Sequence, residues 1–276
     1  MDRQPQPFSA QLLEQVTATF VGEGEQIFNV KTYGAKGDGT TDDTAAINAA
    51  QADAAAVKGS VGFPPGTYLA DQLVISNGDA RWVGLGGSIL RFGAGSVADA
   101  GVRIKHVSGS TKTLLDIQST GATLENIYLD GNSAPEAGLK ISNGFEVRLD
   151  KVRIAYVAGI GLDLRGSCNT SYNDVFVDNC GTVDLPAVRA MPASPRTINT
   201  LDFYGLTIER QPGMALDLGP DVDATTNNYP EFIRITNLHI ETAKDSGGSA
   251  NTVPLMRVRN FRSLTLVNPF IFGGPG

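Results

Sequence analysis

The chain has 276 residues, 41% hydrophobic and 18% charged, a balance typical of a soluble globular protein. Its 22 Lys and Arg against 29 Asp and Glu give a net charge of −7 without any basic run, which argues against nucleic acid as a partner. No apolar stretch reaches about 18 residues, so membrane insertion is not expected. Two cysteines, Cys168 and Cys180, are too few for a disulfide framework, and we expect reduced thiols while leaving a disulfide open.

The leader, residues 1–26, begins MDRQPQPFSA and lacks the apolar core of a secretory signal. We therefore expect a cytoplasmic protein, or one released without a signal peptide, for example by host lysis. Leu13, Val16 and Phe20 follow at helical spacing and predict a helix. This helix is either a plain surface or appended segment, or an attachment or trimerisation segment.

A capped helix is predicted over residues 42–58. Thr41 is a suitable N-cap residue, and Asp42 and Asp43 place negative charge in the first turn, where the helix dipole favours it. Gly59 then ends the helix. The expected apolar stripe consists of Ala46, Ile47, Ala50, Ala54 and Val57. An amphipathic helix placed before an array of strands indicates a cap for the first coil of a solenoid.

The next stretch, VGFPPGTYLA (61–70), predicts two short strands around a Pro-Pro-Gly turn. With FNVKTYGAKGDGTTDDTAAINAA (28–50) before it, this stretch closely resembles the N-terminal signature of the pectate-lyase-like right-handed β-helix family. That family includes polygalacturonases and many bacteriophage tail spikes. The resemblance implies the fold rather than the reaction, because in the family this motif builds the cap and the first coil.

A strand repeat down the rest of the chain predicts the same all-β fold independently. The first inward positions of its copies are Ile127, Val152, Val175, Leu206, Leu238 and Leu264. Between them lie four further strands, at 138–142, 161–166, 214–220 and 255–260. Two or three strands per coil describe a parallel β-helix, and we expect roughly eight coils from residue 61 onward. The β-helix domain is predicted to span residues 27–276.

The familiar motifs of related enzymes are missing or displaced. Polygalacturonases carry Gly-His-Gly, which is absent, and an Arg-Ile-Lys that here falls too early, at 103–105, so we interpret it as strand sequence. RAMPASPR (189–196) only approximates the Arg-x-Pro-x-x-Arg of calcium-dependent pectate lyases, and we interpret it as a proline-rich loop with two solvated arginines. His106 and His239 have no partner at motif spacing and are interpreted as surface strand residues.

A column of carboxylates follows from aligning the repeats. The residues that come after each inward strand are Asp130, Ala155, Asp178, Glu209, Glu241 and Val267. Equivalent positions stack in a solenoid, so Asp178, Glu209 and Glu241 would lie on consecutive coils about 5 Å apart at the backbone. Glycoside hydrolysis needs two carboxyls about 5 Å apart for retention, or about 6.5–9.5 Å apart for inversion. We therefore predict these three as catalytic residues; the alternative is a row of turn residues.

Long insertions at 182–200, 219–231 and 242–254 could wall a groove beside this column. The candidate substrate-binding residues nearby are Tyr204, Tyr229, Arg189 and Arg196. Tyr172 and Phe232 lie in the same region. Aromatic residues there stack on sugars or pack between strands, and the sequence fits both.

Three hypotheses for the function follow. The first is a tail-spike-like protein that binds and hydrolyses a bacterial surface polysaccharide, capsule or O-antigen. The second is a catalytically inactive structural or receptor-binding virion component, and the third is a bacterial polysaccharide lyase or hydrolase. No metal or organic cofactor is expected, since no ligand cluster is evident. The resemblance to tail spikes implies a homotrimer in the virion tail that contacts other tail proteins through its N-terminal segment.

Overall fold

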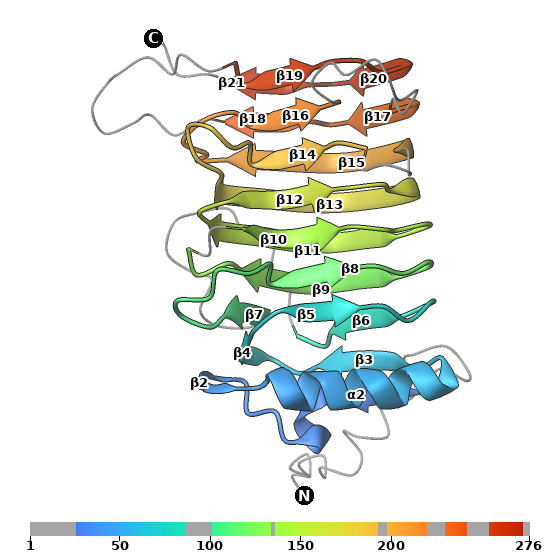
Figure 1. Cartoon of the computed structure of the whole chain (residues 1–276), viewed down its shortest axis with the longest axis vertical. Coiled ribbons are helices and arrows are strands. Elements are labelled where there is room, and N and C mark those ends of the chain that lie inside the picture. The colour runs from blue at the N-terminus through green and yellow to red at the C-terminus, as the bar shows by residue number, and fades with distance from the viewer. Residues whose placement is uncertain are drawn as a thin grey trace, which may run out of the picture.

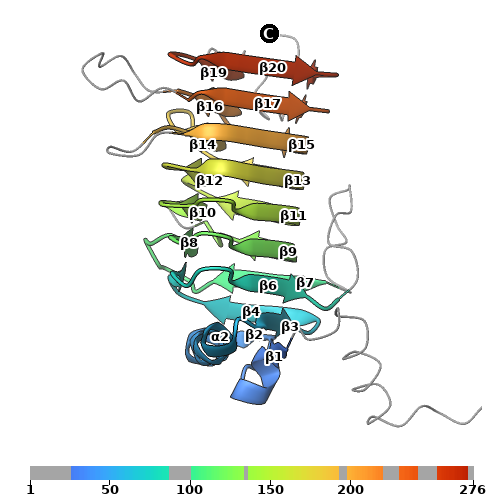
Figure 2. The same ribbon diagram turned by 90° about the vertical axis from the view of Figure 1, so that its right-hand side faces the viewer.

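The computed structural model describes residues 26–86, 101–133, 136–192, 198–219, 230–241 and 254–272. Within them, parallel strands stack coil upon coil along one axis, with helix α2 at one end and β19, β20 and β21 at the other (Figure 1). Figure 2 shows the same stack from the side, with α2 beneath the first coil. The chain is thus a right-handed parallel β-helix, as the sequence predicted. Among the described helices, none has the length and hydropathy needed to cross a membrane.

Each coil has three faces, built from two sheets. The 14-stranded sheet follows the path β1 (Ile27–Asn29), β3 (Ser60–Phe63), β6 (Arg81–Gly84), β9 (Thr123–Asp130), β11 (Arg148–Val157), β13 (Cys168–Cys180), β15 (Asn199–Glu209), β17 (Phe232–Thr236) and β20 (Ser263–Val267). Its branches are β2 (Asp38–Asp42), β4 (Gly66–Ala70) and β7 (Val102–His106), which lead into β9, and β18 (His239–Glu241) and β21 (Phe270–Phe272), which continue from β15. The path strands form the first face. The branch strands and the C-terminal halves of β9, β11, β13 and β15 form the second face.

The third face is the seven-stranded sheet. Its strands, in stacking order, are β5 (Leu73–Ile75), β8 (Leu115–Ile117), β10 (Ala137–Ile141), β12 (Ile160–Leu164), β14 (Val188–Ala190), β16 (Leu216–Leu218) and β19 (Met256–Val258). Four of these strands were predicted as the second repeat series. On the first face, eight path strands follow from β3 to β20, in agreement with the expected coil number.

One left-handed residue per coil bends the chain from the first face to the second. These corner residues, with φ between 48° and 78°, are Asn126, Lys151, Asp174, Gly205, Asn237 and Asn268. Asparagine, aspartate and glycine tolerate this conformation best, which explains most of the column. Because the corner recurs at the same place in each coil, long strands such as β13 supply two faces without a loop.

The interior fills with stacked aliphatic side chains. Ile127, Val152, Val175 and Leu206 stand in register on neighbouring coils, as predicted. Leu264 also packs against the core, as predicted, but its place in this column is wrong, because it pairs with Ile233 on the first face. In the last two coils the first and second faces are separate strands, so the sixth repeat copy belongs to β20 and not to the second face.

The cap consists of a short 3-10 helix, η1 (Val30–Tyr33), and α2 (Thr44–Val57), slightly shorter than the predicted 42–58. The buried side chains of α2 are Ile47, Ala50, Gln51 and Ala54. Val57 was expected in this stripe but is 56% exposed, because it lies in the last turn, beyond the strands that the helix covers. The helix therefore closes the first coil through small side chains that allow close approach.

Both ends of α2 depend on specific backbone contacts. The N-cap is Asp43 and not Thr41, and its buried carboxylate accepts hydrogen bonds from the backbone N of Lys36 at 2.6 Å and of Gly37 at 3.0 Å. This carboxylate ties the loop before the helix to the helix start. At the other end, Gly59 is required because a Cβ there would lie 2.6 Å from the backbone oxygen of Gln26.

We expect Gly205→Ala to destabilise the stack. Gly205 has φ of 78°, and a Cβ would lie 2.7 Å from Oδ1 of Asp174 on the neighbouring coil. The left-handed backbone alone costs about 1–2 kcal/mol for a non-glycine residue, and the contact adds to it. Urea denaturation should show this loss. Gly78→Ala is the control, since its nearest contact is at 3.7 Å and its φ is not left-handed, and an equal loss in both variants would contradict the argument.

Candidate active site

The predicted carboxylate column exists on the outward side of the second face. In register, coil after coil, it runs Lys105, Asp130, Ala155, Asp178, Glu209, Glu241 and Phe272. The stacking predicted from Asp130 to Glu241 is confirmed. Only the last member is wrong: Val267 pairs with Thr236 on the first face, for the same reason that displaces Leu264.

A second outward column lies two residues earlier in each strand, because alternate residues share one side of a sheet. Its members are Arg103, Tyr128, Arg153, Phe176, Thr207, His239 and Phe270. The guanidinium of Arg153 lies 5.1 Å from the ring centroid of Tyr128 and 5.0 Å from that of Phe176. All three side chains are buried. On β9, β11 and β13 the second face therefore carries a buried cation–π stack.

Asp178 belongs to this buried part of the second face. Its side chain is fully buried, and Oδ2 accepts a hydrogen bond from Nη2 of Arg153 at 2.7 Å. Arg210 binds both carboxylate oxygens, with Nε at 2.7 Å from Oδ1. Two guanidinium groups thus compensate one buried carboxylate and join three coils. The Asp178 side chain has no exposed surface. Its role is therefore to support the exposed carboxylates next to it.

Glu209, His239 and Glu241 form an open cluster directly above. Nε2 of His239 lies 3.6 Å from Oε1 of Glu209 and 3.6 Å from Oε2 of Glu241. The three side chains are 22%, 35% and 52% exposed. The imidazole stacks on the ring of Phe270, with centroids 4.9 Å apart and an interplanar angle of 17°. This stacking fixes the ring between the two carboxylates, so the cluster is a preformed acidic site at the surface.

The pKa of Glu209 is raised above its ordinary value. Burial is the largest cause, the charge of His239 opposes it, Glu241 and Asp178 raise the pKa further, and Arg210 lowers it. Crowding by neighbouring carboxylates contributes to this rise, but partial burial contributes more. Glu209 is also less exposed than Glu241, although both residues occupy the same column.

His239 was missed by the sequence analysis, which placed it as an ordinary surface residue. The signal was present in His-Ile-Glu (239–241), because residues two apart in a strand share a face. His106, also expected on the surface, is fully buried, and its Nε2 lies 3.0 Å from the backbone oxygen of Lys112. It packs inside the coil and takes no part in the site.

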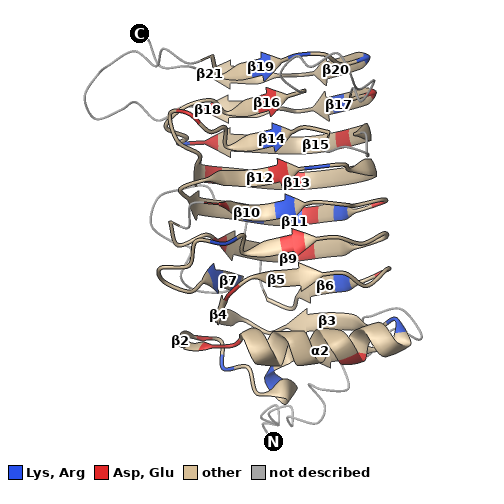
Figure 3. Ribbon diagram, viewed as in Figure 1, with Lys and Arg blue, Asp and Glu red and all other residues tan. Residues whose placement is uncertain are grey.

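Arg189 lies in β14 on the third face and not in a loop, so the interpretation of RAMPASPR is wrong at its first residue. Its Nε and Nη2 donate to the carboxylate of Asp163 at 2.9 and 2.7 Å. The outward column of this face alternates in charge along Asp116, Lys140, Asp163, Arg189, Asp217 and Arg257 (Figure 3). Arg189 is thus part of a charge ladder, away from the cluster. Arg196 and Tyr229 lie outside the described residues.

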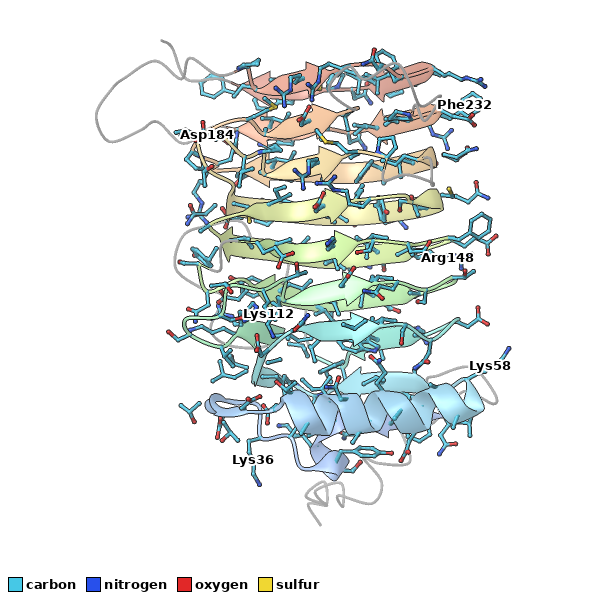
Figure 4. The ribbon with its side chains drawn as sticks, in the orientation of Figure 1. Lys36, Lys58, Lys112, Arg148, Asp184 and Phe232 are labelled. Carbon is cyan, nitrogen blue, oxygen red and sulfur yellow. The ribbon has the colours of Figure 1, made fainter. Side chains whose placement is uncertain are left out.

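Tyr204 is 55% exposed on the first face, one residue before the Gly205 corner. Phe232 on β17 is also exposed, at the same edge of the stack as Arg148 (Figure 4). Tyr172, in contrast, is buried and packs on Phe203 with ring centroids 4.7 Å apart, so strand packing explains it. Tyr204 and Phe232 therefore lie around the corner from the acidic cluster, whereas the exposed Phe270 and Phe272 adjoin it.

The two cysteines lie at opposite ends of β13, and no disulfide joins them. Cys180 is buried in the core, and this burial raises the pKa of its thiol to about 12. The length of β13 separates the two sulfurs too far for a disulfide between them within one chain. Neither sulfur contributes to the acidic cluster.

Comparisons with known proteins agree with this architecture. The sequence model of the family described as rhamnogalacturonase A/epimerase, pectate lyase-like matches residues 27–181, which is more than half of the chain. A depolymerase of Klebsiella phage KN3-1, described as specific for capsule KN3, is 30% identical over 175 residues, which are 58% of this chain and 22% of that protein. The mannuronan C5-epimerase AlgE2 of Azotobacter vinelandii is 30% identical over 158 residues, 49% of this chain and 15% of that protein.

Among solved structures, the ORF18 protein of Geobacillus virus E2 is similar in fold, with a TM-score of 0.69 and 19% identity. That match covers 91% of this chain and 50% of the viral protein. The chain thus spans about half of this viral protein and less than a quarter of the two curated relatives. The names of the Klebsiella phage and Azotobacter relatives both describe proteins that act on polysaccharides.

The pKa of Glu209 gives a direct test of the cluster. By carboxyl-detected NMR titration, we expect the pKa of Glu209 to lie above the ordinary value of a glutamate. Glu241→Gln should lower the pKa of Glu209, because it removes a like charge. His239→Gln should raise it, because it removes a cation that stabilises the carboxylate. Shifts in the opposite directions would mean that the three side chains do not face one another.

Proposed function

Because the chain belongs to the rhamnogalacturonase A/epimerase, pectate lyase-like family, we propose that it is a tail-spike-like protein that binds and hydrolyses a bacterial surface polysaccharide. The observation that carries this proposal is the exposed pair Glu209 and Glu241 on neighbouring coils of a rigid scaffold. The similarity to the Klebsiella phage depolymerase supports a capsule or O-antigen as the substrate class. The reaction chemistry follows from the spacing of the pair.

The spacing favours a retaining mechanism. One oxygen of Glu209 and one of Glu241 lie within 4.8 Å of each other. Retaining glycosidases hold their carboxyls about 5–5.5 Å apart, whereas inverting enzymes need about 6.5–9.5 Å to admit a water molecule. The less exposed Glu209 is the acid that protonates the leaving glycosidic oxygen, while Glu241 attacks the anomeric carbon and forms a glycosyl ester. Glu209 then removes a proton from the water that hydrolyses the ester.

Binding of the polysaccharide extends from the cluster around the corner to the first face. Tyr204 and Phe232 present exposed rings on which sugars can stack. Beside them, Arg234 and Asp202 form an exposed pair, with Nε 3.0 Å from Oδ1, that can exchange hydrogen bonds with hydroxyl groups. Arg189 is engaged by Asp163 on the third face, which favours Tyr204 over Arg189 as a sugar contact.

A lyase or epimerase is the second candidate. It is favoured by the imidazole of His239 between two carboxylates, since these reactions begin with abstraction of a proton beside a carboxylate of a uronate sugar, and by the similarity to a mannuronan C5-epimerase. Unsaturated products, detected by ultraviolet absorbance, would support a lyase, and incorporation of solvent deuterium without cleavage would support an epimerase. New reducing ends without unsaturation support hydrolysis.

Glu209→Gln should decrease the rate of polysaccharide cleavage by about 10²–10⁴-fold, because it removes a general acid–base group. Binding should persist, since the substitution is nearly isosteric. The assay measures new reducing ends on a panel of capsule and lipopolysaccharide preparations, and product NMR should show retention of anomeric configuration.

Glu146→Gln, an exposed change at the first-face edge, is the control and should cleave normally. Normal cleavage by both Glu209→Gln and Glu241→Gln would reduce the column to a row of turn residues. Tight binding of a polysaccharide without any product from the unmodified chain would instead support the inactive receptor-binding alternative.

For the assembly we propose a homotrimer in the virion tail, with the N-terminal segments joined at one end and in contact with other tail proteins. Family resemblance to tail spikes supports it, and symmetric closure buries strand faces that a monomer exposes. Light scattering of this chain should give three times its mass of 29.1 kDa. A monomer that persists at micromolar concentration would contradict this proposal.

A further inference from the structure

The cluster of Glu209, His239 and Glu241 also has the geometry of a metal site. Its three ligand atoms, two oxygens and one nitrogen, lie within 4.8 Å of one another. Nε2 of His239 is 3.6 Å from both oxygens, which is longer than an N–H···O hydrogen bond of about 2.7–3.2 Å. Among the described residues, this buried nitrogen atom has no hydrogen-bond partner. An unsatisfied nitrogen held between two carboxylates fits a metal ion, which accepts electron pairs from the nitrogen and from one oxygen of each carboxylate.

The spacing matches the coordination sphere of a small cation. Zinc bonds of about 2.0–2.2 Å to nitrogen and oxygen place neighbouring ligand atoms about 3.0–3.5 Å apart. The two separations of 3.6 Å reach this range after a small side-chain adjustment. An imidazole together with carboxylates suits zinc, nickel or cobalt, whereas calcium and magnesium select oxygen ligands alone.

The surroundings favour a divalent ion. Two carboxylates balance a charge of +2, and the neighbouring Arg210 is already engaged by Asp178, so its charge is compensated. Stacking on Phe270 fixes the imidazole ring, which lowers the entropy lost when the ion binds. Glu241 is half exposed, so solvent can reach the remaining coordination positions.

We propose that Glu209, His239 and Glu241 bind one divalent transition-metal ion, such as zinc. Binding follows from the geometry of the three side chains alone. Its consequence rests on the proposed function: a metal ion on the carboxylate pair inhibits hydrolysis, because the ion occupies both carboxylates that the glycosidic bond must reach. The ion acts as an inhibitor and not as a cofactor.

The test uses the full chain without an affinity tag, freed of metal with chelator. Titration with cobalt should give visible ligand-field absorption that saturates at one equivalent, and calorimetry with zinc should give the same stoichiometry. Glu209→Gln, His239→Gln and Glu241→Gln should each weaken binding at least about tenfold, since even residues that only support a metal ligand cost about 10–100-fold. Circular dichroism shows whether each variant keeps its strands.

Two matched controls accompany these variants. Glu146→Gln removes an exposed carboxylate elsewhere and should bind as the unmodified chain does. Cys168→Ser removes the half-buried thiol and should also leave binding unchanged. Absence of saturable binding, or binding that survives all three cluster substitutions, overturns the proposal.

A separate activity measurement distinguishes this inference from the proposed function. If zinc binds to the cluster and the metal-free chain cleaves no polysaccharide, the metal site stands and the hydrolase proposal fails. If the metal-free chain cleaves and saturating zinc leaves the rate unchanged, the inhibition fails and the carboxylate pair is not the catalytic one. Inhibition with the same zinc dependence as binding supports both.

Discussion

Parallel stacking in register is the constraint on which the rest of this molecule depends. Each coil pairs with the next one residue for residue, so a side chain meets its own equivalents at about 4.8 Å above and below. Inside the helix this makes columns of aliphatic residues. On the outer surface, a charge repeated in successive coils lies next to a like charge, which destabilises a sheet. Every outward column must therefore alternate, pair or expose its charges.

Two parts of the molecule follow this rule in different ways. The third face alternates acids with bases, as between Asp163 and Arg189. The second face places Arg153 between aromatic rings and compensates the buried Asp178 with two guanidinium groups. Breaking such a buried pair leaves an uncompensated charge, so loss of either partner destabilises the stack.

How far the sequence leads can be judged from this column. The repeat predicted the stacking of Glu209 on Glu241. Residues alternate between inward and outward within a strand, and each coil has one equivalent residue, and both patterns can be found from the local sequence. It did not predict the burial of Asp178, since that requires Arg210, which reaches it from the corner after β15. Nor did it assign Leu264, because the separation of the two faces in the last coils changes which strand a repeat copy occupies.

Glu209 and Glu241 satisfy this rule by exposure alone, and that is what makes them informative. Among the described residues, these two carboxylates in register lack the alternation of the third face and have an imidazole between them, while the nearby Arg210 is bound by Asp178. Repulsion between them is unfavourable for folding, yet the scaffold holds both side chains at the surface, where a proton, a cation or a sugar can relieve it. A rigid β-helix cannot remove the repulsion by moving its strands apart. The fold thus leaves the negative charge of this site partly uncompensated, and a bound ligand can compensate it.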